Sequence, residues 1–259
     1  MAELESNDPS AARVGDIVAR DVAMAAKVLQ LANSALLGLR CQISNVHQAV
    51  LLIGMEMMRA LVVSVHIFSH FEADNLGELD LARLWKHSLG TANVALGIAR
   101  AEHVPKQVQE DSFSAGLLHD IGKLILADTM ADRYKEVIKR LRAEEIPLIQ
   151  AERESFDSTH AEVGAYLVGI WGLPPSIVES TAWHHVPSTS GACTFTPLTA
   201  VHAANVLIGD GDFSHLGKKE VLDERHLENV GMTDRKRNWK RIYESVTWGM
   251  QAKAEVKHD

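Results

Sequence analysis

Five histidines and one aspartate are placed where they could together bind a metal ion. These residues are His87, His119, Asp120, His160, His184 and His185. Each stands beside apolar residues in a segment with helical spacing, and a buried ionisable group costs free energy unless it is paired, hydrogen-bonded or bound to a metal. Four helices that project imidazoles and a carboxylate into one interior can form a metal site. The alternative is a polar cavity in which these histidines hydrogen-bond to helix ends and loops.

The types of ligand narrow the choice of metal. Imidazole together with carboxylate suits iron, manganese, nickel or zinc, and the lack of cysteine in the set disfavours a structural zinc site. The stretch GLLHDIGKL, residues 116–124, places Lys123 three residues after Asp120 among apolar neighbours. The sequence therefore predicts a divalent-metal pocket around this stretch, and it leaves open whether a metal is bound.

The elements that position these side chains are predicted to be helices. Apolar residues recur at intervals of three and four, and period-two alternation is not sustained anywhere. Gly172-Leu173-Pro174-Pro175 ends one helix, because proline removes a backbone donor and disfavours helix before it. Thr233 is a candidate N-cap for the last helix. The predicted helices cover residues 24–35, 81–95, 160–171, 176–185, 198–208 and 233–254. The fold class is therefore all-α.

Composition excludes several classes of protein. The chain has 259 residues, 46% of them hydrophobic, and a net charge of −8, which is typical of a packed domain and not of a nucleic-acid binder. The longest apolar stretch, residues 46–68, contains Glu56 and Arg59, so we expect a buried helix and not a membrane span. Two cysteines and an N-terminus without a signal sequence favour a cytoplasmic location. One basic cluster is interpreted as a solvated helix face: Arg235, Lys236, Arg237, Lys240 and Arg241.

The chain is predicted to divide into two helical lobes and a tail. Residues 1–75 form an apolar N-terminal lobe, and residues 76–210 form a second lobe that carries the histidine cluster. The polar, glycine-containing stretch HFEADNLGELD, residues 70–80, is a natural connection between them. Residues 211–259 form a C-terminal tail that ends in a helix.

Several of these motifs together resemble the HDOD family, the HD-related output domains. The resemblance rests on HSLGTANVALGIA from His87, FSAGLLHDIGKLIL around His119, and HAEVGAYLVGIWGLPPSIVESTAWHH from His160. AAKVLQLANSALLGL, residues 25–39, with its Asn33-Ser34-Ala35 step, is similar as well. The resemblance spans about residues 14–208. It implies a multi-helix architecture in which an apolar N-terminal lobe packs on an HD-like lobe.

The resemblance also implies roles for individual residues. The HD superfamily consists of all-α metal-dependent phosphohydrolases, and its HD-GYP branch degrades cyclic di-GMP. In the order of HD-GYP ligands, His87 matches the first histidine, His119 and Asp120 match the HD dyad, and His160 matches the middle histidine. His184 and His185 match the histidine pair. Lys123 resembles the lysine that contacts phosphate, so that Asp120 and Lys123 would be the catalytic candidates.

Two departures from that ligand order argue against full activity. Arg83 stands where HD-GYP enzymes have a glutamate one turn before the first histidine, and a guanidinium repels cations. It could contact a substrate phosphate instead. Asn205 stands at the closing aspartate, and its amide is a weaker, neutral ligand. Because a dinuclear site needs carboxylate charge to offset the repulsion between two cations, we expect one ion, or two loosely held.

Two functions remain open from the sequence. The first is a bacterial signal-transduction module of HDOD type, non-catalytic or weakly active, which acts by binding a protein partner or a small ligand such as a nucleotide or phosphate. The alternative is a metal-dependent phosphohydrolase that cleaves phosphodiesters or phosphomonoesters. Neither a membrane nor a nucleic acid is an expected partner.

Overall fold

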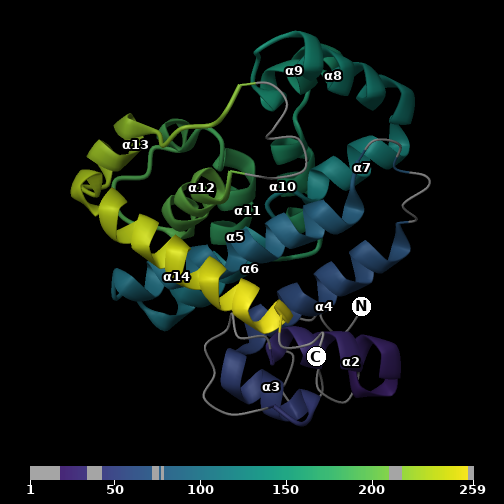
Figure 1. Cartoon of the computed structure of the whole chain (residues 1–259), viewed down its shortest axis with the longest axis vertical. Helices are drawn as coiled ribbons and strands as arrows, with labels where there is room; N and C mark the ends of the chain where they lie inside the picture. Colours follow the sequence, from purple (N-terminus) through teal and green to yellow (C-terminus); the bar gives the residue numbers. More distant parts are fainter. Residues whose placement is uncertain (1–17, 34–42, 72–75, 77–78, 210–217, 256–259) are drawn as a thin grey trace. The chain divides into compact units, whose positions relative to one another are not determined.

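A computed structural model describes residues 18–33, 43–71, 76, 79–209 and 218–255 of the chain. All regular elements in these ranges are helices, as the sequence predicts (Figure 1). The chain divides into two compact units, residues 1–70 with 244–259, and residues 71–243. No helix among the described residues is long and apolar enough to cross a membrane.

In the described part of the first unit, the helices α2 (Val22–Ala32), α3 (Val46–Ile53) and α4 (Met55–His70) pack on one another. The single helix predicted over residues 46–68 is therefore wrong. Gly54 separates α3 from α4 because its φ of 90° is open to glycine and strained for other residues. Asp21 and Asn45 cap α2 and α3 through side-chain oxygens that accept backbone N–H groups.

Asn33 ties the end of α2 to the chain before α3. Its side-chain NH2 donates to Ile43 O at 2.7 Å, and its Oδ1 accepts from Ile43 N at 2.6 Å. This pair of hydrogen bonds gives Asn33, the first residue of the Asn33-Ser34-Ala35 step, a structural role. Ser34 and Ala35 lie outside the described residues.

The second unit is built around α5 (Leu81–Ala101), the longest helix that lies wholly within it. The helices α6 (Lys106–Leu118) and α12 (Pro197–Ile208) pack on α5 and on each other. Gly116 permits the close approach of α6 to α5, because a Cβ atom there would lie 2.7 Å from Ala92 Cα. Small residues at this crossing thus bring α5 and the end of α6 close together.

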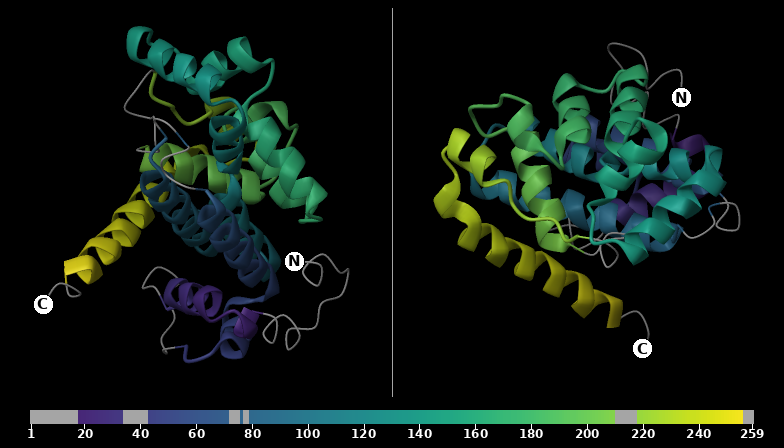
Figure 2. Two further views of the ribbon diagram at one scale, coloured as in Figure 1. Left: turned by 90° about the vertical axis from the view of Figure 1, so that its right-hand side faces the viewer. Right: turned by 90° about the horizontal axis from the view of Figure 1, so that it is seen from above.

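A second group of helices packs beside this core (Figure 2). The helix α7 (Ile121–Thr129) packs on α10 (His160–Ile170), and α10 packs on α11 (Pro175–Trp183). Between α7 and α10 the chain forms a hairpin of α8 (Ala131–Ala143) and α9 (Leu148–Phe156). Pro174 and Pro175 precede and start α11, as expected of residues that favour the first turn of a helix.

The last helix begins later than the sequence predicts. Thr233 does not cap a long helix. Residues Thr233–Arg235 form a short 3-10 turn, η4, which follows α13 (Glu224–Asn229) and leads into α14 (Lys236–Glu255). Trp239 is fully buried and donates its indole N–H to Glu102 at 2.8 Å.

The basic cluster within residues 235–241 contains two residues in ion pairs and three exposed residues. Arg235 pairs with Glu102 at 2.8 Å and Lys236 pairs with Glu224, so two of its cations are engaged within the chain. Arg237, Lys240 and Arg241 are exposed, as the interpretation of a solvated helix face requires.

Replacing Gly122 by alanine should strongly destabilise the protein. A Cβ atom at Gly122 would lie 2.0 Å from His160 O and 2.8 Å from Gly164 N, both backbone atoms that cannot move aside locally. We expect Gly122→Ala to lower the free energy of unfolding by about 2 kcal/mol or more, measured by urea denaturation.

The matched control is Gly169→Ala, in the same packed pair of helices. A Cβ atom there meets nothing closer than 3.9 Å. Because alanine has the higher helix propensity, this variant should be neutral or more stable by up to about 1 kcal/mol. Equal stability of the two variants would contradict the close packing of α7 on α10.

Candidate metal centre

The His119-Asp120 dyad lies at a break between two helices and not inside one. His119 is the C-terminal cap of α6, and Asp120 precedes α7 with φ −99° and ψ 8°, a conformation outside the helical range. The Asp120 carboxylate makes no capping bond to α7. It is therefore available to the interior of the second unit, where it is 1% exposed.

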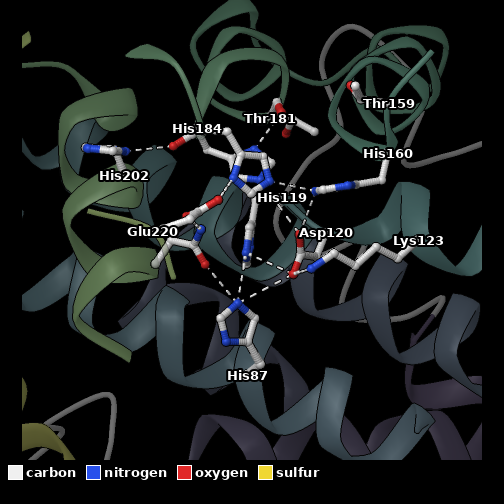
Figure 3. A network of polar contacts seen from close by, with 12 residues as sticks. His87, His119, Asp120, Lys123, Thr159, His160, Thr181, His184, His202 and Glu220 are labelled. Atoms are coloured by element: carbon white, nitrogen blue, oxygen red, sulfur yellow. Dashed lines mark hydrogen bonds and ion pairs between the residues drawn. The ribbon is translucent and has the colours of Figure 1, made fainter. Parts of the chain in front are cut away.

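Asp120 lies at the centre of the predicted ligands (Figure 3). Its Oδ1 lies 3.2 Å from His160 Nε2 and 3.7 Å from His184 Nε2. Its Oδ2 lies 3.3 Å from His119 Nε2 and 3.5 Å from His87 Nε2. Each carboxylate oxygen thus faces a different pair of histidines, and the six predicted ligands come together in two groups that share Asp120.

The histidines come from several separate parts of the fold. His87 comes from the middle of α5, and His160 is the first residue of α10. His184 caps the C-terminus of α11, so the helix expected over residues 176–185 ends before the histidine pair. His185 follows it directly, and its Nε2 lies 2.9 Å from His160 Nε2.

Backbone carbonyls fix the ring orientation of two ligands. His119 Nδ1 lies 2.8 Å from Gly116 O, and His184 Nδ1 lies 2.8 Å from Thr181 O. A carbonyl oxygen can only accept, so Nδ1 carries the proton in both rings. Nε2 of each ring is then turned inward, and the neutral form with its proton on Nδ1 is the one in which imidazole binds a metal.

Carboxylates hold two further ligands in the same way, and the sequence analysis missed both. Glu152, on α9, is fully buried and its Oε2 accepts from His160 Nδ1 at 2.7 Å and from His160 N at 2.9 Å. Glu220 lies against His185 Nδ1. A carboxylate behind a ligating histidine orients the ring and raises its basicity. Neither glutamate stands in a recognisable motif, so only spatial proximity reveals them.

His202 was also missed, although its spacing gave a signal. It lies three residues before Asn205 on α12, where i and i+3 side chains share a face. His202 Nδ1 lies 2.8 Å from His184 O, and its Nε2 accepts from Asp223 N at 2.9 Å. His202 does not belong to either ligand group. It connects the loop of the histidine pair to the chain that follows α12.

Of the two other predicted site residues, Asn205 bonds to the histidine cluster and Arg83 does not. Asn205 is buried at the cluster, with its Oδ1 2.9 Å from His87 Nε2. Arg83 lies one turn before His87 on α5, and its backbone N–H is capped by Asp80. Among the described residues, its guanidinium forms no hydrogen bond or ion pair with the predicted ligands.

Lys123 occupies one side of the Asp120 carboxylate. Its Nζ donates to Asp120 Oδ2 at 2.7 Å, and both side chains are buried. Burial opposes the charge on Asp120, but the attraction of His119 and Lys123 prevails and holds the pKa of Asp120 well below its usual range. The ammonium group repels a cation beside Oδ2, so the Oδ1 side is the better position for a metal.

The cluster contains buried polar atoms that no neighbouring group satisfies. No well-directed hydrogen bond reaches Asp120 Oδ1 or His184 Nε2 from the described residues. The Oδ1 group comprises Asp120, His160, His184 and His185, whose ligand atoms lie within 4.8 Å of one another. Unpaired buried acceptors are rare and costly. The donor set of three imidazoles and one carboxylate fits a divalent ion of the iron, manganese, nickel or zinc type.

The pKa values of the buried histidines are shifted in opposite directions. Burial lowers the pKa of His87 to about 3, despite the attraction of Asp120. For His160 burial also opposes the charge, but the attraction of Glu152 and the proximity of Asp120 outweigh it and raise the pKa to about 9. Burial and the neighbouring histidines hold the pKa values of His184 and His185 well below their usual range.

Comparisons with known proteins agree with this architecture. The HDOD domain family matches residues 1–187. The chain belongs to the HDOD family. A solved HDOD domain protein of unknown function from Geobacter sulfurreducens is 25% identical, with a TM-score of 0.72, over 97% of this chain and 86% of that chain.

Two further solved structures share the fold. One from Shewanella amazonensis SB2B, named "Putative phosphohydrolase", is 19% identical with a TM-score of 0.68, over 95% of this chain and 86% of that one. Another from Marinobacter aquaeolei VT8, named "Putative signal transduction protein", is 20% identical with a TM-score of 0.65, over 94% of this chain and 55% of that one.

A curated relative from Treponema pallidum is 25% identical over 182 residues, which is 70% of this chain and 35% of the relative. It is described as an uncharacterized protein. The chain therefore spans about a third of the length of that relative.

The metal-free HDOD domain should be most stable near the ordinary pKa of histidine. In the unfolded chain His87 takes up a proton below about pH 6.5, whereas in the folded protein it stays neutral down to about pH 3. The stability of the folded protein therefore decreases as the pH drops from about 6.5 to about 3. His160 contributes fully below about pH 6.5, and its contribution is lost as pH rises through about 9.

The measurement is urea denaturation of chelator-treated protein across this pH range. His87→Gln should reduce the loss on the acid side, and His160→Gln should reduce the loss on the alkaline side. A stability that does not change with pH would contradict the assignment of these proton affinities.

Proposed function

We propose that this HDOD domain is a bacterial signal-transduction module that binds a divalent metal ion in its interior and is non-catalytic or weakly active. The observation that carries the proposal is the convergence of five imidazole Nε2 atoms on the two oxygens of one buried carboxylate, Asp120. Nε2 atoms of different rings approach to 2.9 Å and 3.2 Å. In their neutral forms these rings would offer Nε2 lone pairs to an ion, which would bind in place of the protons at this centre.

One side of Asp120 supports the stronger metal site. His160, His184, His185 and Asp120 Oδ1 would hold the ion, and Glu152 and Glu220 stand behind two of the rings. On the other side, the cluster of His87, His119 and Asn205 shares Asp120 Oδ2 with the Lys123 ammonium group. This asymmetry favours one tightly held ion over a matched pair.

Several observations favour regulation over catalysis. Arg83 and Asn205 stand at two positions where the resemblance to HD-GYP enzymes requires carboxylates. The Lys123 ammonium group is bonded to Asp120, and five of the six predicted ligands are no more than 5% exposed. A phosphoester would have to enter this interior before it could react. The name of the Marinobacter relative, which shares the fold, is consistent with a role in signalling through a protein partner or small ligand.

The alternative function is a metal-dependent phosphohydrolase. It is favoured by the bridging position of Asp120, whose two oxygens face two separate ligand groups, as two-metal hydrolases require. A bound metal would supply a water of lowered pKa. Lys123 would then neutralise phosphate charge, and Arg83, from the same helix as His87, would bind the outer phosphate oxygens.

Purified protein should contain about one bound transition-metal ion per chain, as expected of a closed set of histidine and carboxylate ligands. His184→Ala should weaken the binding of Mn2+ or Fe2+ by more than about a hundredfold, because it removes a ligand from the Oδ1 group. Elemental analysis and titration calorimetry measure both quantities.

His103→Asn is the matched control for the loss of one histidine. His103 is exposed and has a φ of 53°, a conformation that asparagine also tolerates. This variant should bind metal as the parent protein does. A parent protein that neither contains nor binds a transition metal would refute the proposal.

Activity assays separate the two candidate functions. We expect bis(p-nitrophenyl) phosphate and p-nitrophenyl phosphate to be turned over equally slowly by the metal-loaded protein and by Asp120→Asn. Turnover that requires metal and disappears in Asp120→Asn would establish the hydrolase instead.

A further inference from the structure

The chain following α12 contributes a carboxylate to the cluster from outside the family match. Residues 218–223 lie beyond residue 187, where the HDOD match ends. Within this segment Glu220 contacts the side chains of two cluster residues, His185 and Asn205. Figure 3 shows Glu220 beside the histidines, on the opposite side of the cluster from Lys123.

Glu220 determines which way the Asn205 amide faces. Its Oε2 accepts from Asn205 Nδ2 at 3.0 Å, while Asn205 Oδ1 lies 2.9 Å from His87 Nε2. A carboxylate can only accept, so it selects the orientation in which the NH2 group points out and the carbonyl oxygen points into the cluster. The neutral amide thereby presents an oxygen ligand where the HD-GYP order has an aspartate.

The same carboxylate also lies against His185. Its Oε1 contacts His185 Nδ1 as an ion pair without the geometry of a directed hydrogen bond, and His185 Nε2, on the opposite side of the ring, faces His160 Nε2. His185 is the most exposed of the predicted ligands and has no backbone carbonyl behind it, unlike His119 and His184. Glu220 is therefore the group placed to hold this ring in its ligating orientation.

The segment is fixed at both ends by bonds that do not involve the predicted ligands. Lys218 N donates to Ile146 O at 3.0 Å. At the other end, Asp223 accepts from Ser188 N at 3.1 Å, and Asp223 N donates to His202 Nε2 at 2.9 Å. These bonds place Glu220 opposite His185 and Asn205 before any ion arrives.

We propose that Glu220 is a positioning residue for the metal centre, which orients His185 in one ligand group and Asn205 in the other. This inference rests on the proposed metal binding and deepens it. Its consequence is that metal occupancy and the position of residues 218–223 are coupled, because binding energy for the ion depends on the carboxylate that this segment carries.

The test is a Co2+ titration of the full chain, followed by calorimetry and by the d–d absorption bands of the bound ion. Glu220→Gln should bind Co2+ about ten- to a hundredfold more weakly than the parent protein. The glutamine oxygen can accept from only one of the two partners well, and its NH2 group meets the donor of the other. The absorption bands should shift, because the orientation of a ligand ring changes.

Two further variants complete the test. Glu220→Asp keeps the charge and should recover part of the affinity, which a general loss of folding would not allow. Glu224→Gln is the matched control, because Glu224 is exposed and pairs with Lys236 away from the cluster. It should leave both affinity and spectrum unchanged.

The outcomes distinguish this inference from the proposed function. If the parent protein binds Co2+ and Glu220→Gln binds it equally well with the same spectrum, Glu220 has no positioning role and metal binding stands. Tighter binding by Glu220→Gln would show that the carboxylate competes with the metal, which also overturns the inference. If the parent protein does not bind Co2+, the proposed metal centre itself fails.

Discussion

The structure of the second unit depends on the burial of one carboxylate, that of Asp120. A buried charge is tolerated only where opposite charge or hydrogen-bond donors surround it. Lys123 supplies the charge at 2.7 Å, and four imidazoles lie within 3.7 Å of the carboxylate oxygens. The helix break before α7 releases the carboxylate from capping its own helix. The charge of Asp120 is therefore compensated only when the helices that carry these groups pack together. These helices are α5, α6, α7, α10 and α11.

The outer partners of the histidines show how the fold would prepare the proposed metal centre. Two rings are held by carbonyls at helix ends, and two are held by carboxylates, Glu152 and Glu220. All four arrangements turn Nε2 toward Asp120. Two glycines contribute to this arrangement, although neither is a predicted ligand. Gly116 and Gly122 allow neighbouring helix backbones to approach where a side chain would keep them apart. A site of this kind is prepared by packing and hydrogen bonding together, and each would be ineffective without the other.

The structure shows the surroundings of Asn205 and Arg83, the two residues that depart from the HD-GYP ligand order. Asn205 stands where the resemblance to HD-GYP enzymes leads one to expect a charged ligand, and Glu220 accepts a hydrogen bond from its amide and supplies negative charge from a different segment. Arg83 shares a helix with His87, but among the described residues its guanidinium forms no hydrogen bond or ion pair with the predicted ligands. The balance of charge differs between the two sides of Asp120, with Lys123 on one side and Glu152 and Glu220 behind the other. This asymmetry is the basis for proposing one principal ion and a regulatory role.

The sequence by itself determined the helical class, the six ligand candidates and the family, because these depend on local periodicity and on motifs of contiguous residues. It also located the helix end at Gly172-Leu173-Pro174-Pro175, where proline acts locally. It misjudged residues 46–68 and Thr233, since the φ of Gly54 and the 3-10 turn η4 are settled by packing. Only the tertiary structure revealed Glu152, His202 and Glu220, which come from α9, α12 and the chain beyond it. Hydrogen bonds between residues remote in sequence leave no local pattern, so the orientation of each histidine was decided by the fold.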